Sequence, residues 1–308
     1  MAHPKVVVLI LTYNGRYLLD EAVFSYLEND YPNFKVAVID NGSHDGTCAY
    51  VEKRFPGVKT IRLDRNYGYS RGFNVGLEYA FESEHARYAL ISNNDVKVDK
   101  NVISELIKVA ETNGKIGFVS GKVYYYDHAD TFQTVGKKED PVRWNGEHIG
   151  NREKDQGQYE EISERVFMDD IFTLVNKNVY DAVGGYDPVF HLQSEEFDWQ
   201  ARAKKAGFRI MYAPRAKLWH KDSMTIGRDS SRKAFYDARN PTLVILLHRS
   251  RTFFRRYFWH HFIQGILKSS LIALKKGKIS IILAKWQGFF SSIAWGSKNR
   301  KLSFGHFV

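Results

Sequence analysis

The sequence predicts an α/β fold in which a mostly parallel sheet is covered by helices on both faces. Between Val6 and Ile91, four short runs of aliphatic or β-branched residues alternate with stretches whose apolar residues recur at helical spacing. Continuous apolar strands separated by helices are typical of parallel sheets that are buried on both sides. The chain has 308 residues, of which 44% are hydrophobic, so it can bury one large core or two modest ones.

The predicted elements follow one another in a regular order. We expect strands at residues 6–11, 36–39, 60–63 and 88–91, and helices at 17–27, 45–54 and 72–83. Farther along, a helix that starts near Glu195 leads into a strand at 209–212, and residues 213–216 are then expected to turn the chain. Gly68, Gly72 and Gly76 are spaced by four, which allows the third helix to approach a strand or a ligand closely.

Polar residues follow each of the four predicted strands. In parallel sheets, ligands bind outside the carboxyl ends of the strands. The residues at these ends are Thr12 and Asn14, Asp40 and Ser43, Asn66, and Asn93, Asn94 and Asp95. Helix caps and turns explain such residues at one strand end, but their recurrence at four ends indicates a binding site.

The sequence carries neither a dinucleotide-binding glycine motif nor a phosphate-binding P-loop. If this site binds phosphates, another group must neutralise them. A divalent metal held by oxygen ligands would do so, with Asp95 as the first candidate ligand.

A second group of acids, Glu195, Glu196 and Asp198, opens the predicted helix near residue 195. Glu195 and Asp198 share one face of that helix, whereas Glu196 projects about a quarter-turn away. One of these carboxylates can therefore point into a cleft while the others hold the helix. The alternative is that acids are enriched here because they complement the helix dipole. Further on, His220 is by itself more typical of a structural histidine than of a ligand.

The charge is unevenly distributed along the chain. The net charge is +10, yet no Asp or Glu follows Asp237, while thirteen Lys and Arg residues do. The apolar residues of this basic tail fall on two helical stripes, Phe258, Trp259, Phe262, Ile263, Ile266, Leu267 and Leu271, and Ile281, Ile282, Trp286, Phe289, Phe290, Ile293 and Trp295. Basic amphipathic helices with Trp and Phe suit an anionic membrane surface. Packing on the body or on another subunit is the alternative, and we expect no nucleic acid partner because the aromatics lie on the apolar stripes.

We expect a cytoplasmic protein that is peripheral on the inner face of the cell membrane. Cys48 is the single cysteine, and the apolar run at 6–11 is too short for a secretory signal. The polar stretch at 126–161 is expected to be too charged for the core. It is interpreted as a hairpin above the binding site, either a lid or a plain surface insertion.

A series of motifs along the chain resembles those of a known family. Residues 5–247 carry, in order, "VVVLILTYNG", "VIDNGSHDGT", "NYGYSRGFNVG", "ISNNDV", "DQGQY", "VGGYDPVF", "EEFDWQARAKKAGFRIMYAPRAKLWHKDS" and "YDARNP". This series resembles the inverting family 2 glycosyltransferases of GT-A fold, and most of all their rhamnosyltransferase-like branch.

The resemblance implies roles for individual residues. Residues Thr12, Asn14, Asp40, Ser43, Asn66, Gly68, Arg71, Asn93 and Asn94 would bind the nucleotide-sugar donor. Asn93 to Asp95 takes the place of the family's D-x-D motif, and Asp95 and His220 would be ligands of Mn²⁺ or Mg²⁺. Glu196 matches the general base, with Glu195 as the alternative. Asp169 and Asp170 stand where relatives often have a smaller, glycine-containing acceptor segment.

The implied function is transfer of a sugar, from dTDP-rhamnose or a UDP-sugar, to a lipid-linked saccharide during cell-surface polysaccharide synthesis. The transferase domain would span 1–247, with a nucleotide-binding half at 1–125 and an acceptor-binding half at 126–247. Residues 248–308 would form amphipathic helices that associate with membrane or make a homo-oligomer. A noncatalytic sugar-nucleotide-binding or assembly protein would not need Glu196. A sugar nucleotidyltransferase should carry a Gly- and Arg-rich loop after its first strand, which "TYNGRYLLDE" lacks.

Overall fold

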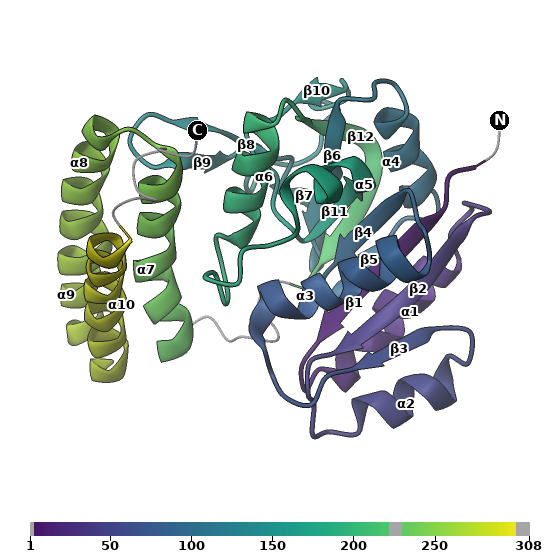
Figure 1. The fold of residues 1–308 in the computed structure, drawn as a ribbon, viewed down its shortest axis with the longest axis horizontal. Helices are drawn as coiled ribbons and strands as arrows, with labels where there is room; N and C mark the ends of the chain where they lie inside the picture. Colours follow the sequence, from purple (N-terminus) through teal and green to yellow (C-terminus); the bar gives the residue numbers. More distant parts are fainter. Residues whose placement is uncertain (1–2, 222–229, 300–308) are drawn as a thin grey trace.

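The computed structural model describes residues 3–221 and 230–299, which form a large sheet flanked by helices and a helical layer at one end (Figure 1). Ten strands make the sheet, in the order β10-β12-β6-β11-β4-β1-β2-β3, with β5 beside β12 and β7 beside β6. They are β1 (Val6–Thr12), β2 (Phe34–Asp40), β3 (Lys59–Arg62), β4 (Tyr88–Ser92), β5 (Val96–Val98), β6 (Ile116–Tyr125), β7 (His128–Thr134), β10 (Ser163–Glu164), β11 (Phe172–Asn176) and β12 (Arg209–His220). A separate hairpin consists of β8 (Lys137–Asp140) and β9 (Trp144–His148).

Helices cover both faces of the sheet. The helices that do so are α1 (Leu19–Leu27), α2 (Thr47–Arg54), α3 (Gly68–Glu78), α4 (Val102–Ala110), α5 (Lys177–Val183) and α6 (Glu195–Lys205). At one end of the molecule lie α7 (Ser231–His248), α8 (Arg251–His260), α9 (Ser269–Lys275) and α10 (Ile279–Lys298). A 3₁₀ turn at Arg16–Leu18 precedes α1, a π-helical turn at Tyr79–Ser83 follows α3, and another at His261–Lys268 joins α8 to α9. The strands and helices predicted in the first ninety or so residues are all present.

The first half of the sheet is parallel, as predicted. β1 pairs in parallel with β2 and with β4, and β2 pairs in parallel with β3. Alternate residues of β1 enter two cores, since Val8 packs with α1 and α4 whereas Leu9 packs with α3. A Cβ at Gly72 would lie 2.7 Å from Leu11 Cδ1, so the glycine allows α3 to approach the strand, as expected from the glycine spacing.

The second half of the sheet is mixed. β11 runs antiparallel to β4 and β6, whereas β12 runs parallel to β6 and antiparallel to β5. The turn predicted at 213–216 is wrong, because β12 continues to His220 through a shift of register between Ala213 and Lys217. Such a bulge tolerates Pro214 within a strand. A Cβ at Gly121 would lie 2.1 Å from the Ala216 carbonyl oxygen, so the partner strand needs glycine there.

The stretch at 126–161 contains β7 and the β8–β9 hairpin, which confirms the predicted hairpin. The expectation that it is too charged for the core is wrong in part. Phe132 and Val135 are fully buried, and the buried Lys122 of β6 pairs with Asp155 at 3.0 Å. The stretch therefore contributes to the core on its inner side, where its charged residues have partners.

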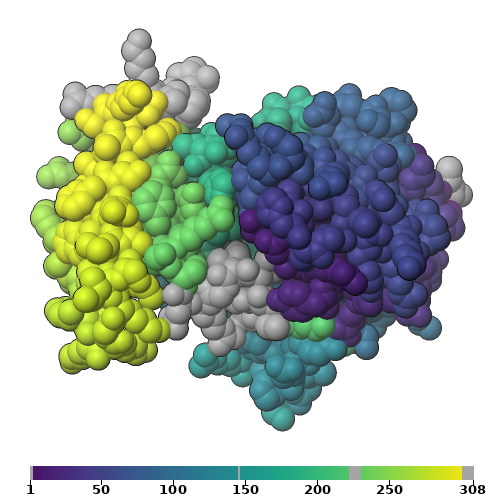
Figure 2. Space-filling model, turned by 90° about the horizontal axis from the view of Figure 1, so that it is seen from below, coloured from purple at the N-terminus to yellow at the C-terminus, as the bar shows by residue number. Residues whose placement is uncertain are grey.

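The C-terminal helices form a lobe at one end of the molecule (Figure 2). α7 packs against α6 through an apolar cluster that includes Phe197 and Leu243, and α10 lies along α7. A Cβ at Gly288 would lie 2.2 Å from the Phe235 carbonyl oxygen, so these two helices are in close contact. Among the described residues, none of the helices has the length and hydropathy required to cross a bilayer.

The residues of the predicted apolar stripes of the tail fall into two groups, which differ in burial. Their inner residues, including Phe258, Phe262, Ile266 and Phe289, pack against one another between the helices. Six stripe members are exposed, namely Trp259, Ile263, Leu267, Leu271, Phe290 and Ile293. Four more exposed residues of the tail lie outside the predicted stripes, namely Ile272, Leu274, Ile279 and Leu283, so the tail holds ten of the fourteen exposed large hydrophobic residues of the described chain. Packing on the body therefore accounts for the inner residues only.

Candidate active site

The carboxyl ends of three neighbouring strands bring the first predicted residues together. Thr12 of β1 lies opposite Asp40 of β2, and β4 ends beside β1 at Ser92. The chain beyond β4 turns back over this edge, where Asn94 donates a hydrogen bond to the Thr12 hydroxyl at 2.9 Å. The parallel strands thus place polar groups at one sheet edge, as the sequence predicts.

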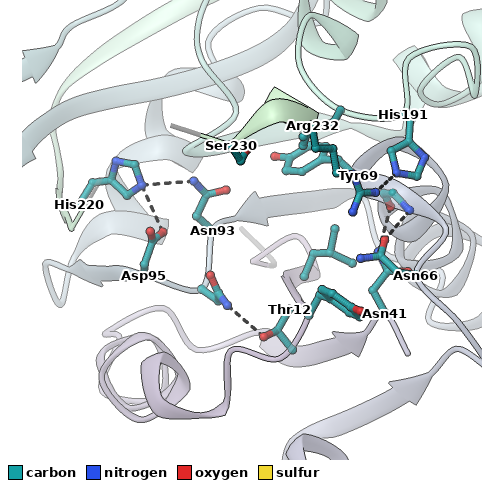
Figure 3. Close-up of a pocket in the computed structure, with 15 residues that line it drawn as sticks. Thr12, Asn41, Asn66, Tyr69, Asn93, Asp95, His191, His220, Ser230 and Arg232 are labelled. Atoms are coloured by element: carbon teal, nitrogen blue, oxygen red, sulfur yellow. Dashed lines mark hydrogen bonds and ion pairs between the residues drawn. The ribbon is translucent and has the colours of Figure 1, made fainter. Parts of the chain in front are cut away.

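A pocket of about 350 Å³ opens above this edge (Figure 3). Seven of the predicted site residues line it, namely Thr12, Asn66, Gly68, Asn93, Asn94, Asp95 and His220. The other lining residues have no role assigned from the sequence, and they are Leu11, Tyr13, Asn41, Tyr69, His191, Leu192, Ser230 and Arg232. Arg232 contacts His191 and adds a positive charge to the lining. Burial and this charge lower the pKa of His191.

Four predicted donor residues do not line the pocket. Asp40 is buried and accepts a hydrogen bond from the Ser43 backbone N–H at 2.9 Å. Ser43 in turn accepts one from the Asn14 backbone N–H, and the Asn14 side chain accepts one from His44. These residues brace the turn behind the pocket, while Arg71 is exposed on α3.

A hydrogen-bonded pair of asparagines, Asn41 and Asn66, fixes the backbone at the start of α3, and the sequence did not predict this pairing. Asn41 donates to Asn66 Oδ1 at 3.2 Å and to the Gly68 carbonyl at 3.0 Å, and it accepts from the Tyr67 backbone N–H. Gly68 has a φ of +86°, and a Cβ there would collide with His191. Asn41 directly follows Asp40 at the end of β2, so the strand-end pattern contained a signal for it.

Asp95 and His220 meet at one end of the pocket (Figure 3). His220 Nε2 lies 3.1 Å from Asp95 Oδ1 and 3.4 Å from the Asn93 amide nitrogen. The pairing of β5 with β12 causes this meeting, because His220 lies opposite Val96 in the ladder. Both side chains are almost fully buried.

Asp95 and His220 fit two coordination positions of a divalent ion whose other positions are filled by other ligands. Two ligands at about 2.1 Å from one ion and at right angles to each other lie about 3 Å apart, close to the 3.1 Å observed. In the described part of the chain, no group of three or more His, Cys, Asp or Glu side chains has a metal-binding arrangement. An ion here would therefore depend on phosphate and water oxygens, which is how proteins usually hold Mg²⁺.

Four carboxylates gather at the start of α6. Asp169 and Asp170 precede β11, and Glu195 and Glu196 are the first residues of α6. Asp169 pairs with Lys137 at 3.1 Å and with His148 at 3.2 Å. Glu195 is buried, and its Oε2 has no hydrogen-bond partner among the described residues. The sequence predicts this cluster only in part, since it assigns a role to Glu195 and Glu196 but not to Asp169 or Asp170.

The pKa values of these acids shift in opposite directions, because burial raises all of them and only Asp169 has basic partners that outweigh it. Burial, and then the charge of Asp170, raise the pKa of Glu196 to about 8. Burial also raises the pKa of Asp170 to about 7, and that of Glu195, which lies beside Glu196, well above its usual value. Burial would raise the pKa of Asp169 as well, but Lys137 and His148 hold it below the usual value. The cluster therefore combines one firmly ionised carboxylate with three that hold protons more tightly.

Tyr69 connects the pocket with this cluster. It lines the pocket, and its hydroxyl donates to the Asp170 carbonyl oxygen at 3.1 Å. Burial raises its pKa well above the usual value, and the charges of Asp170, Glu195, Glu196 and Asp95 add to the effect. The charges of both the pocket and the acid cluster therefore act on this one hydroxyl, and Asp95 is the one of the four acids that lines the pocket.

The loop before α6 is fixed by α7. Gln193 and Ser194 have left-handed φ values of +66° and +69°, which are unfavourable for residues other than glycine. The buried Asn240 donates to the carbonyls of Leu192 and Gln193 at 2.7 and 2.8 Å, and Arg239 donates to the Val189 carbonyl at 3.0 Å. Asn240 thus stabilises the turn from which Glu195 and Glu196 project.

Asp198 has a different environment from Glu195 and Glu196. It accepts hydrogen bonds from His248 of α7 and Arg202 of α6, at 2.7 and 2.8 Å. Burial alone would raise its pKa, but His248 and Arg202 hold it below the usual value. Asp198 therefore anchors α6 to α7.

Comparison with known proteins assigns the family. A family model described as "Glycosyl transferase family 2" matches residues 7–184, which are more than half of the chain. The chain belongs to glycosyl transferase family 2. The matched range contains the sheet edge with Thr12, Asp40 and Asp95, and it ends before α6.

Curated relatives of this family 2 member are distant. Poly-beta-1,6-N-acetyl-D-glucosamine synthase of Staphylococcus epidermidis is 24% identical over 221 residues, which are 71% of this chain and 50% of the synthase. N-acetylglucosaminyl-diphospho-decaprenol L-rhamnosyltransferase of Mycobacterium tuberculosis is 25% identical over 212 residues, 63% of this chain and 68% of that protein. The chain matches only 26% of the length of the uncharacterized protein y4gI of Sinorhizobium fredii, at 26% identity. It thus spans half or less of two of these relatives.

Solved structures share the fold. The crystal structure of GalNAc-T7 with UDP, GalNAc and Mn²⁺ has a TM-score of 0.64 at 14% identity, covering 96% of this chain and 57% of that one. The mannosyltransferase PcManGT of Pyrobaculum calidifontis, in complex with GDP-Man and Mn²⁺, has a TM-score of 0.53 at 14% identity, covering 98% and 89%. These similarities confirm the predicted GT-A fold of this family 2 member.

Replacing Asn240 by Ala should loosen the loop before α6. The change leaves two partly buried carbonyls without their donor, so we expect the free energy of unfolding to fall by about 2 kcal/mol. Amide hydrogen exchange should accelerate in peptides that cover residues 190–196. Asn178→Ala, at an exposed position of α5, is the matched control. Equal exchange of residues 190–196 in the wild type and Asn240→Ala would contradict the assigned role.

Proposed function

We propose that this chain is an inverting glycosyltransferase that moves a sugar from a nucleotide diphosphate to a lipid-linked saccharide. The observation that carries the proposal is the position of Tyr69, which contacts the pocket above the sheet edge and the acid cluster. A donor bound in the pocket and an acceptor bound at the acid cluster would therefore lie on opposite sides of the Tyr69 side chain. Membership of glycosyl transferase family 2 supports the same assignment.

The donor is proposed to be dTDP-rhamnose or a UDP-sugar. Thr12, Asn66 and Gly68 line the pocket at the sheet edge and would contact the nucleoside. Asn14, Asp40, Ser43 and Arg71 would support that contact from the turn and the helix behind it. The relative from Mycobacterium tuberculosis, by its name, transfers L-rhamnose to a decaprenol-linked saccharide, which supports rhamnose and a lipid-linked acceptor.

The diphosphate would lie at the end of the pocket formed by Asn93, Asn94, Asp95 and His220. A divalent ion, Mn²⁺ or Mg²⁺, held by Asp95 and His220 would neutralise negative charge that develops on the leaving diphosphate. Arg232 lines the same pocket and would add a fixed positive charge.

The acceptor would be activated by Glu196, with Glu195 as the alternative. In a single displacement, the acceptor hydroxyl gives its proton to the carboxylate, and its oxygen bonds to the anomeric carbon. The bond from that carbon to the diphosphate oxygen breaks, and the electron pair leaves with the nucleoside diphosphate. Because attack comes from the face opposite the leaving group, the anomeric configuration inverts. A raised pKa makes Glu196 a stronger base than an exposed glutamate.

The first experiment tests donor use. UDP-, dTDP- and GDP-sugars are incubated with the protein, Mn²⁺ or Mg²⁺ and a lipid-diphosphate saccharide, and nucleotide release is measured. We expect release with one donor class, loss of that release in chelator, and near-complete loss in Asp95→Ala. Donor binding without release in every condition would favour the alternative of a noncatalytic sugar-nucleotide-binding or assembly protein. Full turnover of Asp95→Ala in chelator would refute the metal role.

The second experiment tests the base. Glu196→Gln keeps the shape of the side chain but removes the proton acceptor, so we expect kcat to fall roughly 10²- to 10⁴-fold with donor affinity unchanged. Because a base acts in its ionised form and burial raises the pKa of Glu196 to about 8, kcat/KM for the acceptor should rise with pH up to about 8 and then level off. Glu195→Gln is the matched control. If it alone causes the large loss, the base is Glu195.

The tail is proposed to hold the enzyme on the anionic inner face of the membrane. Its outer surface combines ten exposed large hydrophobic residues with a basic sequence that has no acid after Asp237. Lys and Arg attract anionic lipid, while exposed Trp, Leu and Ile insert among the acyl chains.

We retain 1–247 and 248–308 as proposed domains, since α7 ends at His248. A homo-oligomer that covers the same surface is the alternative.

A negative charge introduced on the apolar surface of the tail tests this proposal. Leu271 is 60% exposed, and Ile162 of the body, 55% exposed, is its matched control. Insertion of one Leu side chain contributes about 1.5–3 kcal/mol, so Leu271→Glu should weaken binding to phosphatidylglycerol vesicles at least ~10-fold, while Ile162→Glu should not. A point substitution suits this test because removing α10 would uncover α7. Unchanged vesicle binding together with a smaller sedimentation mass for Leu271→Glu would point to subunit packing instead.

A further inference from the structure

Gln133 of β7 reaches the candidate metal ligand His220. Its side-chain Oε1 lies 2.8 Å from His220 Nδ1. The two residues come together because β7 and β12 both pair with β6, and His220 lies opposite Tyr125 while Phe132 lies opposite Tyr124. The stretch at 126–161, for which the sequence left a lid or a surface insertion open, thus contacts the site directly.

The backbone around Gln133 is firmly fixed. Phe132 and Thr134, its neighbours, are buried, and the Phe132 ring stacks on Tyr124 with 5.0 Å between centroids. The Gln133 carbonyl accepts a hydrogen bond from the Asn151 side chain at 2.9 Å. A fixed backbone limits the positions that the Gln133 amide can take, which suits a residue that orients another side chain.

The contact selects one tautomer of His220. An amide oxygen accepts hydrogen bonds and does not donate them, so His220 Nδ1 carries the proton. In the neutral ring, Nε2 then presents a lone pair, to which the Asn93 amide nitrogen can donate across 3.4 Å. Asp95 Oδ1 is a second acceptor at 3.1 Å from the same nitrogen. Two lone pairs at this distance favour a cation that both can bind.

We propose that Gln133 is a positioning residue that holds His220 in the tautomer needed to bind a divalent cation together with Asp95. This inference rests on the metal site of the proposed function. A hydrogen bond from the other ring nitrogen commonly fixes metal-binding histidines, and loss of such a partner weakens metal affinity by about 10- to 100-fold. Gln133 acts through His220 and does not touch the ion.

The test measures Mn²⁺ binding to the full chain, without turnover, from the electron paramagnetic resonance signal of free Mn²⁺. Gln133→Leu removes the acceptor and should weaken binding about 10-fold or more. Gln133→Glu supplies a carboxylate oxygen that accepts the same proton, so its affinity should equal or exceed that of the wild type. Gln156→Leu, an exposed position in the same stretch, is the matched control and should bind as the wild type does.

His220→Ala separates the two levels of the proposal. If His220→Ala binds Mn²⁺ as the wild type does, the metal site is wrong, and the role of Gln133 is refuted with it. If His220→Ala loses binding but Gln133→Leu does not, the site stands and only the role of Gln133 is refuted. An equal loss in Gln133→Leu and Gln133→Glu would also refute that role, because a merely structural residue would show it. Thermal unfolding of each variant checks that the chain is folded.

Discussion

The site depends on the pairing of β5 with β12. This short antiparallel ladder sets His220 opposite Val96, and the Lys221 backbone N–H donates to the Asp95 carbonyl at 2.9 Å. Residues far apart in the sequence thereby become neighbours at the sheet edge. The register depends on the bulge in β12, which in turn needs glycine at position 121 for close approach of the strands. Displacement of this bulge by one residue would point His220 away from Asp95, since side chains alternate along a strand.

α7 links three parts of the molecule. Its N-cap residue Ser230 and Arg232 of its first turn line the pocket, its middle holds the loop before α6 through Asn240, and α10 packs along it. The proposed function requires that the proposed membrane surface and the cleft lie at a fixed distance from each other. α7, a single helix of 18 residues, contacts both the pocket and the tail layer and so connects the two directly.

Much of this arrangement is encoded locally. Thr12, Asp40 and Asp95 follow apolar strands whose alternation with helices is visible in the sequence, so their meeting at one edge can be predicted. Tyr69, His191 and Arg232 reach the pocket through loops and helix packing that no periodicity encodes. Asp170 lies near Glu196 because β11 inserts between β4 and β6, which the sequence pattern does not indicate. In the tail, periodicity finds the apolar residues but cannot separate Phe262, which packs inward, from Ile263, which is exposed.

The central claim is that Asp95 and His220 bind one divalent ion beside the donor diphosphate. Anomalous scattering from crystals grown with MnCl₂ and a nucleoside diphosphate tests it most directly. The account predicts one strong manganese peak within bonding distance of Asp95 and His220 Nε2, in contact with the diphosphate. A diphosphate bound in the pocket with no manganese at Asp95, or a peak among Asp169, Asp170, Glu195 and Glu196 instead, would contradict it.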